Sequence, residues 1–380
     1  MKYRKFGKSG FEVSALGFGC MRFPKDSETG EVQEAEAIRM LRRAIDEGVN
    51  YVDTAYMYHG GESERIVGRA LKDGYRDKVK LATKMPVPKV QEYADFDRLC
   101  NEQLEKLDDT HIDYYLLHGL NKDKWDRVRD LGVLDWAREA VNDGRIGALG
   151  FSFHGPYEGF EHIICDYDGW ALAQIQYNYM NENVQAGTKG LELAASRDIP
   201  VVVMEPLLGG NLVDPPPAIQ KLWDNAPVKR SAAEWALLWL WHKPEVSVVL
   251  SGMSSMSQVE ENLAIADRSG VDILSNEELE IIAQVRDVYE QLRPIPCTGC
   301  RYCMPCPYGV DIPRNLRMYN TGYIYNKMPQ QRGVYQRMKE GTRAEDCVQC
   351  RACEEFCPQE IQISEWMPCV HAELSKTGAF

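Results

Sequence analysis

Cysteine is scarce over most of this chain: of twelve cysteines in 380 residues, only Cys20, Cys100 and Cys165 precede residue 297. Long apolar runs are missing too, because the most apolar stretch, "AAEWALLWLW", is short and contains Glu234. The first ten residues, "MKYRKFGKSG", lack the apolar core of a secretory signal peptide. We therefore expect a cytoplasmic protein with no membrane partner, whose cysteines stay reduced and form no disulfides.

Positive charge is also in short supply. Lys and Arg number 44 against 57 Asp and Glu, so the net charge is -13. A surface for nucleic acid or for anionic lipid needs an excess of basic side chains. The balance argues against both partners and favours small-molecule chemistry.

The glycine fingerprint of an open dinucleotide-binding sheet is absent as well. The stretch "GFGCMR" offers Gly17 and Gly19, but Arg22 stands where the third glycine belongs. We interpret the glycine pair as turn chemistry at a strand end rather than as a phosphate cradle.

Residues 1–293 instead show a regular alternation of strand and helix patterns, which follows an opening hairpin pattern. Eight short apolar runs are typical of strands: residues 16–22, 49–55, 79–84, 112–118, 146–153, 171–178, 200–205 and 246–253. The alternation predicts a parallel sheet closed into a (β/α)8 TIM barrel, with a doubly wound open sheet as the alternative. We also expect Ser257 and Glu260 to form a capping box at the start of the last helix of the pattern.

Four polar residues stand at or just beyond the ends of successive predicted strands, which is where barrel enzymes place catalytic groups. Asp53 ends the second strand with Tyr58 in the following loop, and Lys84 and His118 end the third and fourth. A lysine ammonium is expected to lower the pKa of a nearby phenol from about 10, while an aspartate keeps the lysine charged. A tyrosine tuned in this way exchanges a proton with a carbonyl or alcohol oxygen. Each residue alone has a structural explanation, but the set favours catalysis.

Six motifs in a fixed order resemble the aldo-keto reductases. They are "YVDTAYMYHGGESERIVGRAL", "LATK", "DYYLLH", "IGALGFSF", "QIQYN" and "EPLLGG", and the resemblance covers residues 1 to about 270. It implies an enzyme in which Tyr58 is the general acid/base, Lys84 and Asp53 tune it, and His118 orients the substrate carbonyl. It also implies a small carbonyl or alcohol substrate and a nicotinamide cofactor, NAD(H) or NADP(H), held without a Rossmann motif.

The resemblance also assigns residues to the cofactor. It places the carboxamide contacts at Ser152 and Gln174 and the pyrophosphate-side loop at Leu207 and Gly209. It matches the adenosine-binding segment to Ser251, Gly252, Met253, Gln258, Glu261 and Asn262.

Some positions depart from the family pattern. Where the family commonly has asparagine directly after the serine, this chain has Phe153 followed by His154, and Met204 replaces a stacking aromatic. Relatives that prefer NADPH have Lys and Arg where this chain has Gly252 and Gln258. We therefore expect NADH to be accepted at least as well as NADPH.

The other nine cysteines lie in the last 84 residues, behind the prolines of "RPIPC". This shift predicts a barrel domain over 1–293 and a second domain over 294–380. Its two motifs read C-x2-C-x2-C-x2-C-P from 297 and C-x2-C-x2-C-x3-C-P from 347. Zinc sites usually pair CxxC motifs about a dozen residues apart, whereas cysteines at every third position followed by proline favour a cubane iron–sulfur cluster.

This tail is similar to the two-cluster bacterial ferredoxins, a module that occurs on one branch of the aldo-keto reductases. The resemblance implies two [4Fe–4S] clusters, each bound by three cysteines of one motif and the proline-linked fourth cysteine of the other. The two ligand sets are then Cys297, Cys300, Cys303 and Cys357, and Cys347, Cys350, Cys353 and Cys306. Cys369 is left over, and we expect a structural role for it.

The role of the clusters is open at this stage. Nicotinamide moves two electrons as a hydride and a cluster moves one, so exchange between them needs a splitter such as a flavin, which no motif indicates. The clusters either stabilise the small domain or pass single electrons between an external electron carrier and such a splitter. The alternative function is an electron-transfer protein whose barrel is mainly a nucleotide-binding scaffold, but the complete catalytic set favours an oxidoreductase. The basic segment between the motifs is expected to be an amphipathic spacer rather than a nucleic-acid site.

Overall fold

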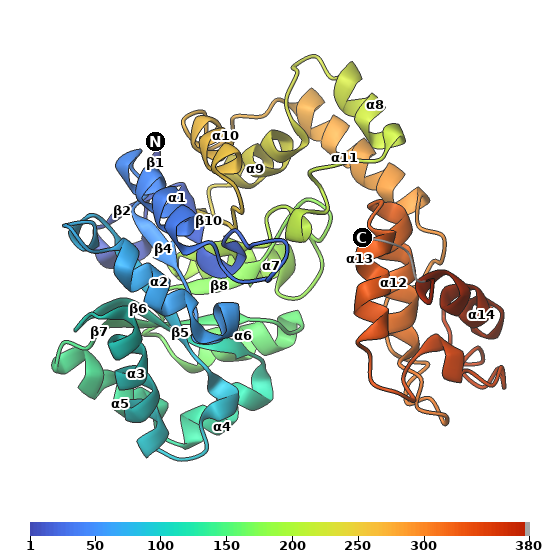
Figure 1. Cartoon of the computed structure of the whole chain (residues 1–380), viewed down its shortest axis with the longest axis horizontal. Helices are drawn as coiled ribbons and strands as arrows, with labels where there is room; N and C mark the ends of the chain where they lie inside the picture. The colour runs from blue at the N-terminus through green and yellow to red at the C-terminus, as the bar shows by residue number, and fades with distance from the viewer. Residues whose placement is uncertain (377–380) are drawn as a thin grey trace. The chain divides into compact units, whose positions relative to one another are not determined.

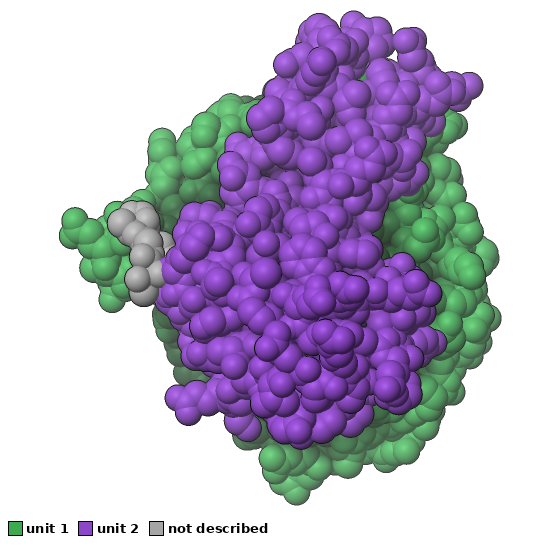
Figure 2. Space-filling view, turned by 90° about the vertical axis from the view of Figure 1, so that its right-hand side faces the viewer, with its two compact units in different colours: residues 1–209, 233–275 green, residues 210–232, 276–380 purple. Residues whose placement is uncertain are grey.

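The computed structural model describes residues 1–376 and divides the chain into two compact units, which Figure 2 colours separately. Unit 1 comprises Met1–Gly209 and Ala233–Ser275, and unit 2 comprises Gly210–Ala232 and the chain from Asn276 onward. Among the described residues, no helix is both long enough and apolar enough to cross a membrane. The domain boundary expected near residue 294 stays a prediction.

Unit 1 is built on a closed barrel of parallel strands, as the sequence predicts (Figure 1). The strands are β3 (Leu16–Gly19), β4 (Tyr51–Asp53), β5 (Lys80–Met85), β6 (Ile112–Leu120), β7 (Ile146–Phe153), β8 (Ala173–Gln176), β9 (Val201–Met204) and β10 (Val246–Ser251). Each strand pairs with the next, and β10 returns to β3, where Val249 lies opposite Leu16. This last pairing closes the barrel and excludes the open sheet.

Helices cover the outside of the barrel (Figure 1). They are α1 (Glu34–Asp46), α2 (Ser63–Ala70), α3 (Ala94–Leu107), α4 (Lys122–Asp130), α5 (Val133–Asn142), α6 (Tyr157–Asp166), α7 (Gly187–Ser196), α9 (Ala232–His242) and α10 (Met256–Ala266). The tryptophan-rich α9 is a core helix, since Trp235 and Trp241 are fully buried. The expected capping box is wrong by two residues: Ser255 caps α10 by accepting from the Gln258 amide, and Glu260 pairs with Arg43.

The opening hairpin closes one end of the barrel. Its strands β1 (Tyr3–Lys5) and β2 (Glu12–Ser14) pair antiparallel, and Phe6 between them packs on Tyr51 and Tyr114 inside the sheet. Phe6 and Val13 share one buried cluster with inward residues of the strands. The carboxyl ends of the strands therefore remain as the end at which a ligand can enter.

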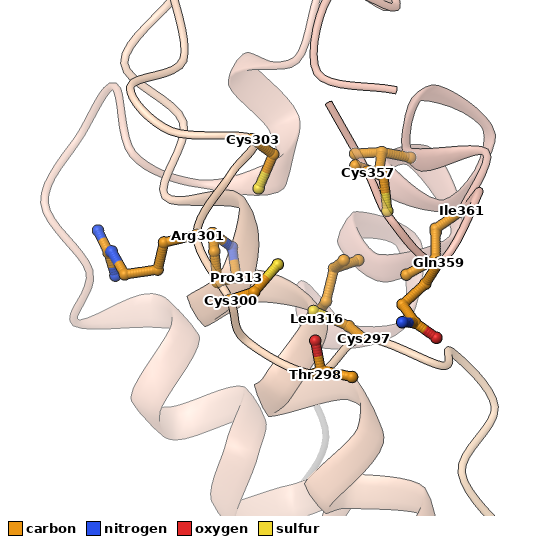
Figure 3. A pocket seen from close by; sticks show the side chains of 11 residues that line it. Cys297, Thr298, Cys300, Arg301, Cys303, Pro313, Leu316, Cys357, Gln359 and Ile361 are labelled. Carbon is orange, nitrogen blue, oxygen red and sulfur yellow. The ribbon is translucent and has the colours of Figure 1, made fainter. Parts of the chain in front are cut away.

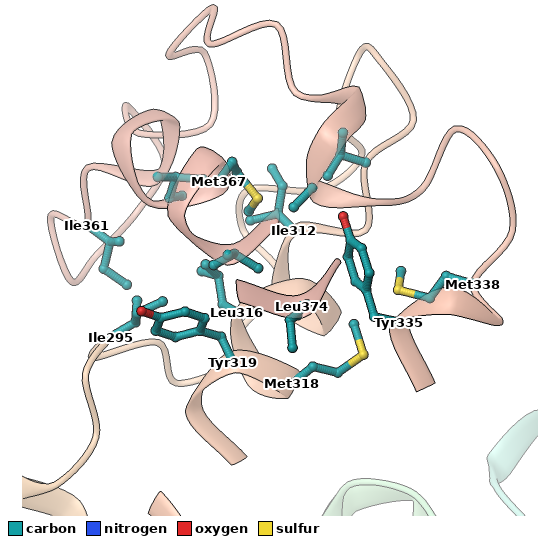
Figure 4. Packing of buried hydrophobic residues seen from close by; sticks show 14 residues of the cluster. Ile295, Ile312, Leu316, Met318, Tyr319, Tyr335, Met338, Ile361, Met367 and Leu374 are labelled. Carbon is teal, nitrogen blue, oxygen red and sulfur yellow. The ribbon is translucent and has the colours of Figure 1, made fainter. Parts of the chain in front are cut away.

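Unit 2 is helical in its described part, with α8 (Pro217–Asn225), α11 (Asn276–Gln291), α12 (Ile312–Ile324), α13 (Met328–Gln336) and α14 (Ile363–Leu374). A buried cluster joins α12, α13 and α14, with Leu316, Met367 and Leu374 near its centre (Figure 4). The cysteine motifs lie in loops before α12 and before α14, and six of their cysteines pack against this core. The α12 helix buries Met318 and exposes Arg317, so the basic segment is amphipathic as expected.

Candidate active site and cluster sites

Lys84 lies at the centre of the predicted catalytic group, near the end of β5. Its Nζ donates to Asp53 Oδ1 at 2.6 Å, to the Thr54 carbonyl at 2.7 Å and to Tyr58 Oη at 3.4 Å. Lys84 and Asp53 are 1% and 3% exposed, so their ion pair is buried. Because β4 and β5 are neighbours in the barrel, adjacent strand ends bring the pair together.

Tyr58 and His118 complete the arrangement. Tyr58 opens the short turn Tyr58–Gly61 after β4, and His118 lies in the last part of β6. Their rings meet edge to face, with centroids 6.2 Å apart and planes at 84°. The structure thus gathers all the residues of the predicted catalytic set at one end of the barrel.

The pKa of Tyr58 departs from expectation. Burial raises it, and the ammonium of Lys84 offsets only part of that rise. The expectation of a lowered pKa is therefore wrong. In this half-buried position, the hydration free energy that a phenolate loses exceeds the stabilisation that it gains from one ammonium. Tyr58 keeps its proton at neutral pH and is a proton donor.

The two basic residues beside Tyr58 differ in charge. Burial alone would lower the pKa of Lys84, but Asp53 and Tyr58 raise it above its ordinary value, so the ammonium persists. Burial, together with Lys84, His154 and Lys124, lowers the pKa of His118 to about 3. His118 is therefore neutral and can hydrogen-bond an oxygen without adding charge.

A buried polar network behind Lys84 was not predicted. Gln103 Nε2 donates to the Lys84 carbonyl at 3.1 Å, and Thr83 Oγ1 donates to Glu64 Oε1 at 2.6 Å. Glu64 is fully buried, and burial raises its pKa. The network fastens β5 to α2 and α3 and so fixes the strand that carries Lys84. Its only signal in the sequence is that Glu64 and Gln103 occupy inward positions of amphipathic helices.

Ser152 and Gln174, the predicted carboxamide contacts, lie opposite each other on β7 and β8. Gln174 Nε2 donates to Asp53 Oδ2 at 3.1 Å, whereas its Oε1 is buried and has no hydrogen-bond partner within residues 1–376. Ser152 Oγ accepts from the Gly119 amide at 2.8 Å and keeps its own proton to donate. A buried acceptor beside a free hydroxyl fits an amide group such as the nicotinamide carboxamide.

Arg22 lies against two of the predicted cofactor loops. A Cβ on Gly209 would lie 3.2 Å from Arg22 Nη2, and one on Gly252 would lie 3.1 Å from Arg22 Cδ. The guanidinium is exposed and well suited to phosphate. Sequence reasoning considered Arg22 only as the residue that replaces the third glycine of the fingerprint. Its position beside Gly209 and Gly252 could not be predicted, because it arises when the barrel closes. Leu207 is half-buried in the same loop as Gly209.

The predicted adenosine segment runs from the end of β10 into α10. Ser251 Oγ accepts from Asn262 Nδ2 at 2.9 Å, and both residues are buried, as is Met253. Gln258 Oε1 accepts from the Ser254 amide at 2.8 Å. Glu261 lies exposed on α10.

One cavity in unit 2 is lined by Cys297, Cys300, Cys303 and Cys357 (Figure 3). Its empty volume is about 320 Å³, including the part open to solvent. Three of the cysteines come from the first motif and the fourth from the second. All are free thiols, so this ligand set can bind iron.

The second predicted ligand set is also close together. Burial raises the pKa of Cys347, and the neighbouring thiols Cys306 and Cys350 raise it further. Burial raises the pKa of Cys353, and its neighbours Glu354, Cys303 of the first set and Cys347 raise it further. Within the described part of the chain, no three His, Cys, Asp or Glu side chains converge tightly enough for a single metal ion.

The cysteines outside the motifs differ in burial. Cys20 and Cys100 are fully buried. Cys20 lies close to the catalytic set, since Asp53 raises the pKa of Cys20 and Cys20 raises the pKa of Tyr58. Cys165 is exposed on α6. Cys369 is exposed on α14.

Both parts of the chain match known protein families. Residues 15–286 match the Aldo/keto reductase family, and residues 296–361 match the 4Fe-4S dicluster domain.

Among curated proteins, L-galactose dehydrogenase of Arabidopsis thaliana is 28% identical over 310 residues, covering 75% of this chain and 95% of that protein. Probable aldo-keto reductase 1 of Glycine max is 32% identical over 160 residues, 40% of this chain and 45% of that protein.

Among solved structures, aldo-keto reductase AKR11C1 from Bacillus halodurans, in its holo form, is 27% identical with a TM-score of 0.62, covering 75% of this chain and 96% of that one. An aldo/keto reductase from Klebsiella pneumoniae in complex with NADP and acetate is 26% identical with a TM-score of 0.60, covering 76% and 95%. The chain thus belongs to the aldo/keto reductase family and carries a C-terminal 4Fe-4S dicluster domain.

Proposed function

We propose that this oxidoreductase reduces a small carbonyl compound at the barrel site, with Tyr58 as the proton donor. The observation that carries the proposal is the buried Lys84–Asp53 ion pair, whose ammonium lies 3.4 Å from a phenol that keeps its proton. A reduced nicotinamide, when bound, supplies the hydride for the carbonyl carbon. Tyr58 gives its proton to the carbonyl oxygen, and neutral His118 orients that oxygen. Lys84 stabilises the tyrosinate that remains, and Asp53 keeps Lys84 charged.

Residues already described would hold the nicotinamide cofactor. Gln174 Oε1 and Ser152 offer an acceptor and a donor to the carboxamide, and Arg22 offers a guanidinium to the phosphates beside Gly209 and Gly252. The NADP complex of the Klebsiella pneumoniae relative supports this assignment. We keep the expectation that NADH serves at least as well as NADPH, since positions 252 and 258 carry no cation.

For the tail we propose two [4Fe–4S] clusters with exchanged fourth ligands. The cavity that joins Cys357 to Cys297, Cys300 and Cys303 supports the first set, and the proximity of Cys306 to Cys347 supports the second. Bound clusters supply one-electron exchange. The interval between the two family matches, 286 to 296, supports a domain boundary near residue 294.

A second candidate function has one observation in its favour. Cys300 and Cys350 are exposed, so a bound cluster would reach the surface, as electron exchange with an external carrier requires. In this second function electron exchange is the main activity, and the barrel serves mainly as a nucleotide-binding scaffold. The buried catalytic ion pair favours the reductase, because a scaffold has no use for it.

The test is oxidation of NADH and NADPH by protein purified without oxygen, against a panel of aldehydes and ketones, with wild type and Tyr58→Phe. We expect wild type to reduce some of the panel and the variant to lose turnover while still binding cofactor. Comparable turnover by the variant would remove Tyr58 from the mechanism. Cofactor binding without turnover of any carbonyl, combined with reducible clusters, would favour the second function.

A further inference from the structure

Charge is distributed unevenly along the cysteine-rich tail. Residues 297–343, which contain the first motif, hold eight Lys and Arg against two Asp and Glu. Residues 344–376, which contain the second, hold two against seven. Since the whole chain carries a net charge of -13, the first half of the tail is a local exception.

Part of this positive charge surrounds the cavity of the first cysteine set. Arg301 lines the cavity, and in Figure 3 its side chain extends away from Cys300. Pro313 and Leu316 of α12 line the same cavity, which places Arg314 and Arg317 beside its wall. Residues three apart on a helix are surface neighbours, so these two guanidinium groups lie on one face.

We call Arg301, Tyr302, Arg314 and Arg317 the basic rim. Both helix arginines are exposed, the Arg301 side chain is 60% exposed, and Tyr302 is 68% exposed. Arg301 has only a distant partner, Asp311 at 3.9 Å, and within residues 1–376 neither helix arginine forms an ion pair.

Three other basic side chains of unit 2 form ion pairs. Arg332 pairs with Glu373, Arg343 with Glu345 at 3.2 Å and Lys327 with Asp214 at 3.3 Å. The basic rim therefore combines unpaired guanidinium groups, an exposed aromatic ring and a cavity lined by cluster ligands. Arginine and tyrosine are among the side chains enriched in protein–protein contacts.

We propose that the basic rim is the docking surface of a small acidic electron-carrier protein. The proposal rests on the proposed function of the tail, that is, on a cluster bound by Cys297, Cys300, Cys303 and Cys357. At each encounter the reduced carrier loses one electron and the tail gains one, without a bond forming or a proton moving. Opposite charges steer such encounters and set their orientation. Nucleic acid fits less well, because three arginines in an acidic chain do not form a basic stripe.

The experiment uses the full chain with its clusters, prepared without oxygen, and an acidic flavodoxin as the probe. Stopped-flow spectroscopy follows electron transfer from reduced flavodoxin to the protein, at low and at high salt. The test variant is Arg314→Glu with Arg317→Glu. The matched control is Arg39→Glu with Arg138→Glu, which makes the same change in net charge at exposed barrel helices.

We expect the second-order rate of the test variant to fall about tenfold or more at low salt, and the difference from wild type to shrink at high salt. The control should stay near the wild-type rate. Iron content and the spectrum after chemical reduction are measured on every sample. Absence of clusters from the wild type would overturn the proposed function of the tail, and this outcome is thereby distinguished from loss of docking in the test variant. Equal rates in the test and control variants would overturn the docking surface. Rim-dependent binding of a single-stranded oligonucleotide, without an effect on electron transfer, would assign the rim to nucleic acid instead.

Discussion

The barrel site and the cluster sites of this protein differ in what holds their functional groups in place. In the barrel, Asp53 accepts hydrogen bonds from Lys84 and Gln174. The three residues come from three strands of a closed sheet, and all are buried. In the tail, the cysteines stand on loops and are half-buried or exposed. We infer that the polypeptide alone fixes the first geometry, whereas the second depends in part on bound metal.

The largest effect is expected from Tyr58→Phe, because it deletes the proton donor and leaves the packing of the ring intact. We predict that kcat/KM for carbonyl reduction falls by about 10²–10⁴, the range typical of a general acid. Cofactor affinity, measured by fluorescence titration, should change little. A variant with near wild-type kcat/KM would break the assignment of the barrel site.

Lys84→Met tests whether the barrel site is also a structural element. It leaves Asp53 buried without a counter-charge, so we predict a loss of about 3–5 kcal/mol in the free energy of unfolding, together with loss of turnover. The double variant Lys84→Met with Asp53→Asn should regain most of the stability in denaturant titrations but none of the activity. Recovered activity in the double variant would contradict the role of Lys84.

The cluster ligands give the corresponding test in the tail. Cys357→Ala should remove the cluster of the first motif and Cys306→Ala that of the second, so iron falls from about eight to about four per chain in each. Cys369→Ala, in the same unit but outside both motifs, is the control and should keep all its iron. Electron paramagnetic resonance shows which signal is lost, and loss of the first-motif cluster in Cys306→Ala would contradict the exchanged ligands.

The pH dependence of the barrel follows from the directions of its pKa shifts. His118, with a pKa lowered to about 3, stays neutral across the working range and adds no break there. Tyr58, with a pKa raised by burial, stays protonated, and reduction needs that proton. We predict that kcat/KM for reduction is level through neutral pH and falls only above about 10, the ordinary pKa of a phenol. A break near neutral pH would point to a different proton donor.

The smallest expected effect is a difference in reduction potential between the clusters of the two cysteine motifs. Glu354 follows Cys353 and accepts from the Ser364 amide at 2.7 Å, where the first motif has Met304. A carboxylate beside a cluster disfavours its reduction, so Glu354→Gln should raise the potential of the second cluster and leave the first unchanged. Glu355→Gln, an exposed neighbour with the same change of charge, should have less effect in a redox titration. Equal shifts in both variants would show that only net charge matters.

The sequence predicted the barrel well because its signals are local. Strand ends such as those at Asp53 and Lys84 follow from the alternation of patterns, and the family motifs lie on them. The raised pKa of Tyr58 could not be predicted, because the depth of burial is a property of the assembled barrel. Arg22 was missed for the same reason: its neighbours Gly209 and Gly252 are distant in sequence.

The most direct test of the difference between the two regions uses a cofactor that carries deuterium at its transferable position. Alcohol product is analysed by mass spectrometry for the protein with its clusters, for the same protein after removal of iron, and for Tyr58→Phe. If the polypeptide alone fixes the barrel site, deuterium reaches the carbonyl carbon with or without iron, and Tyr58→Phe forms almost no product. Loss of deuterium transfer on iron removal, in protein whose circular dichroism still shows a folded barrel, would contradict the account.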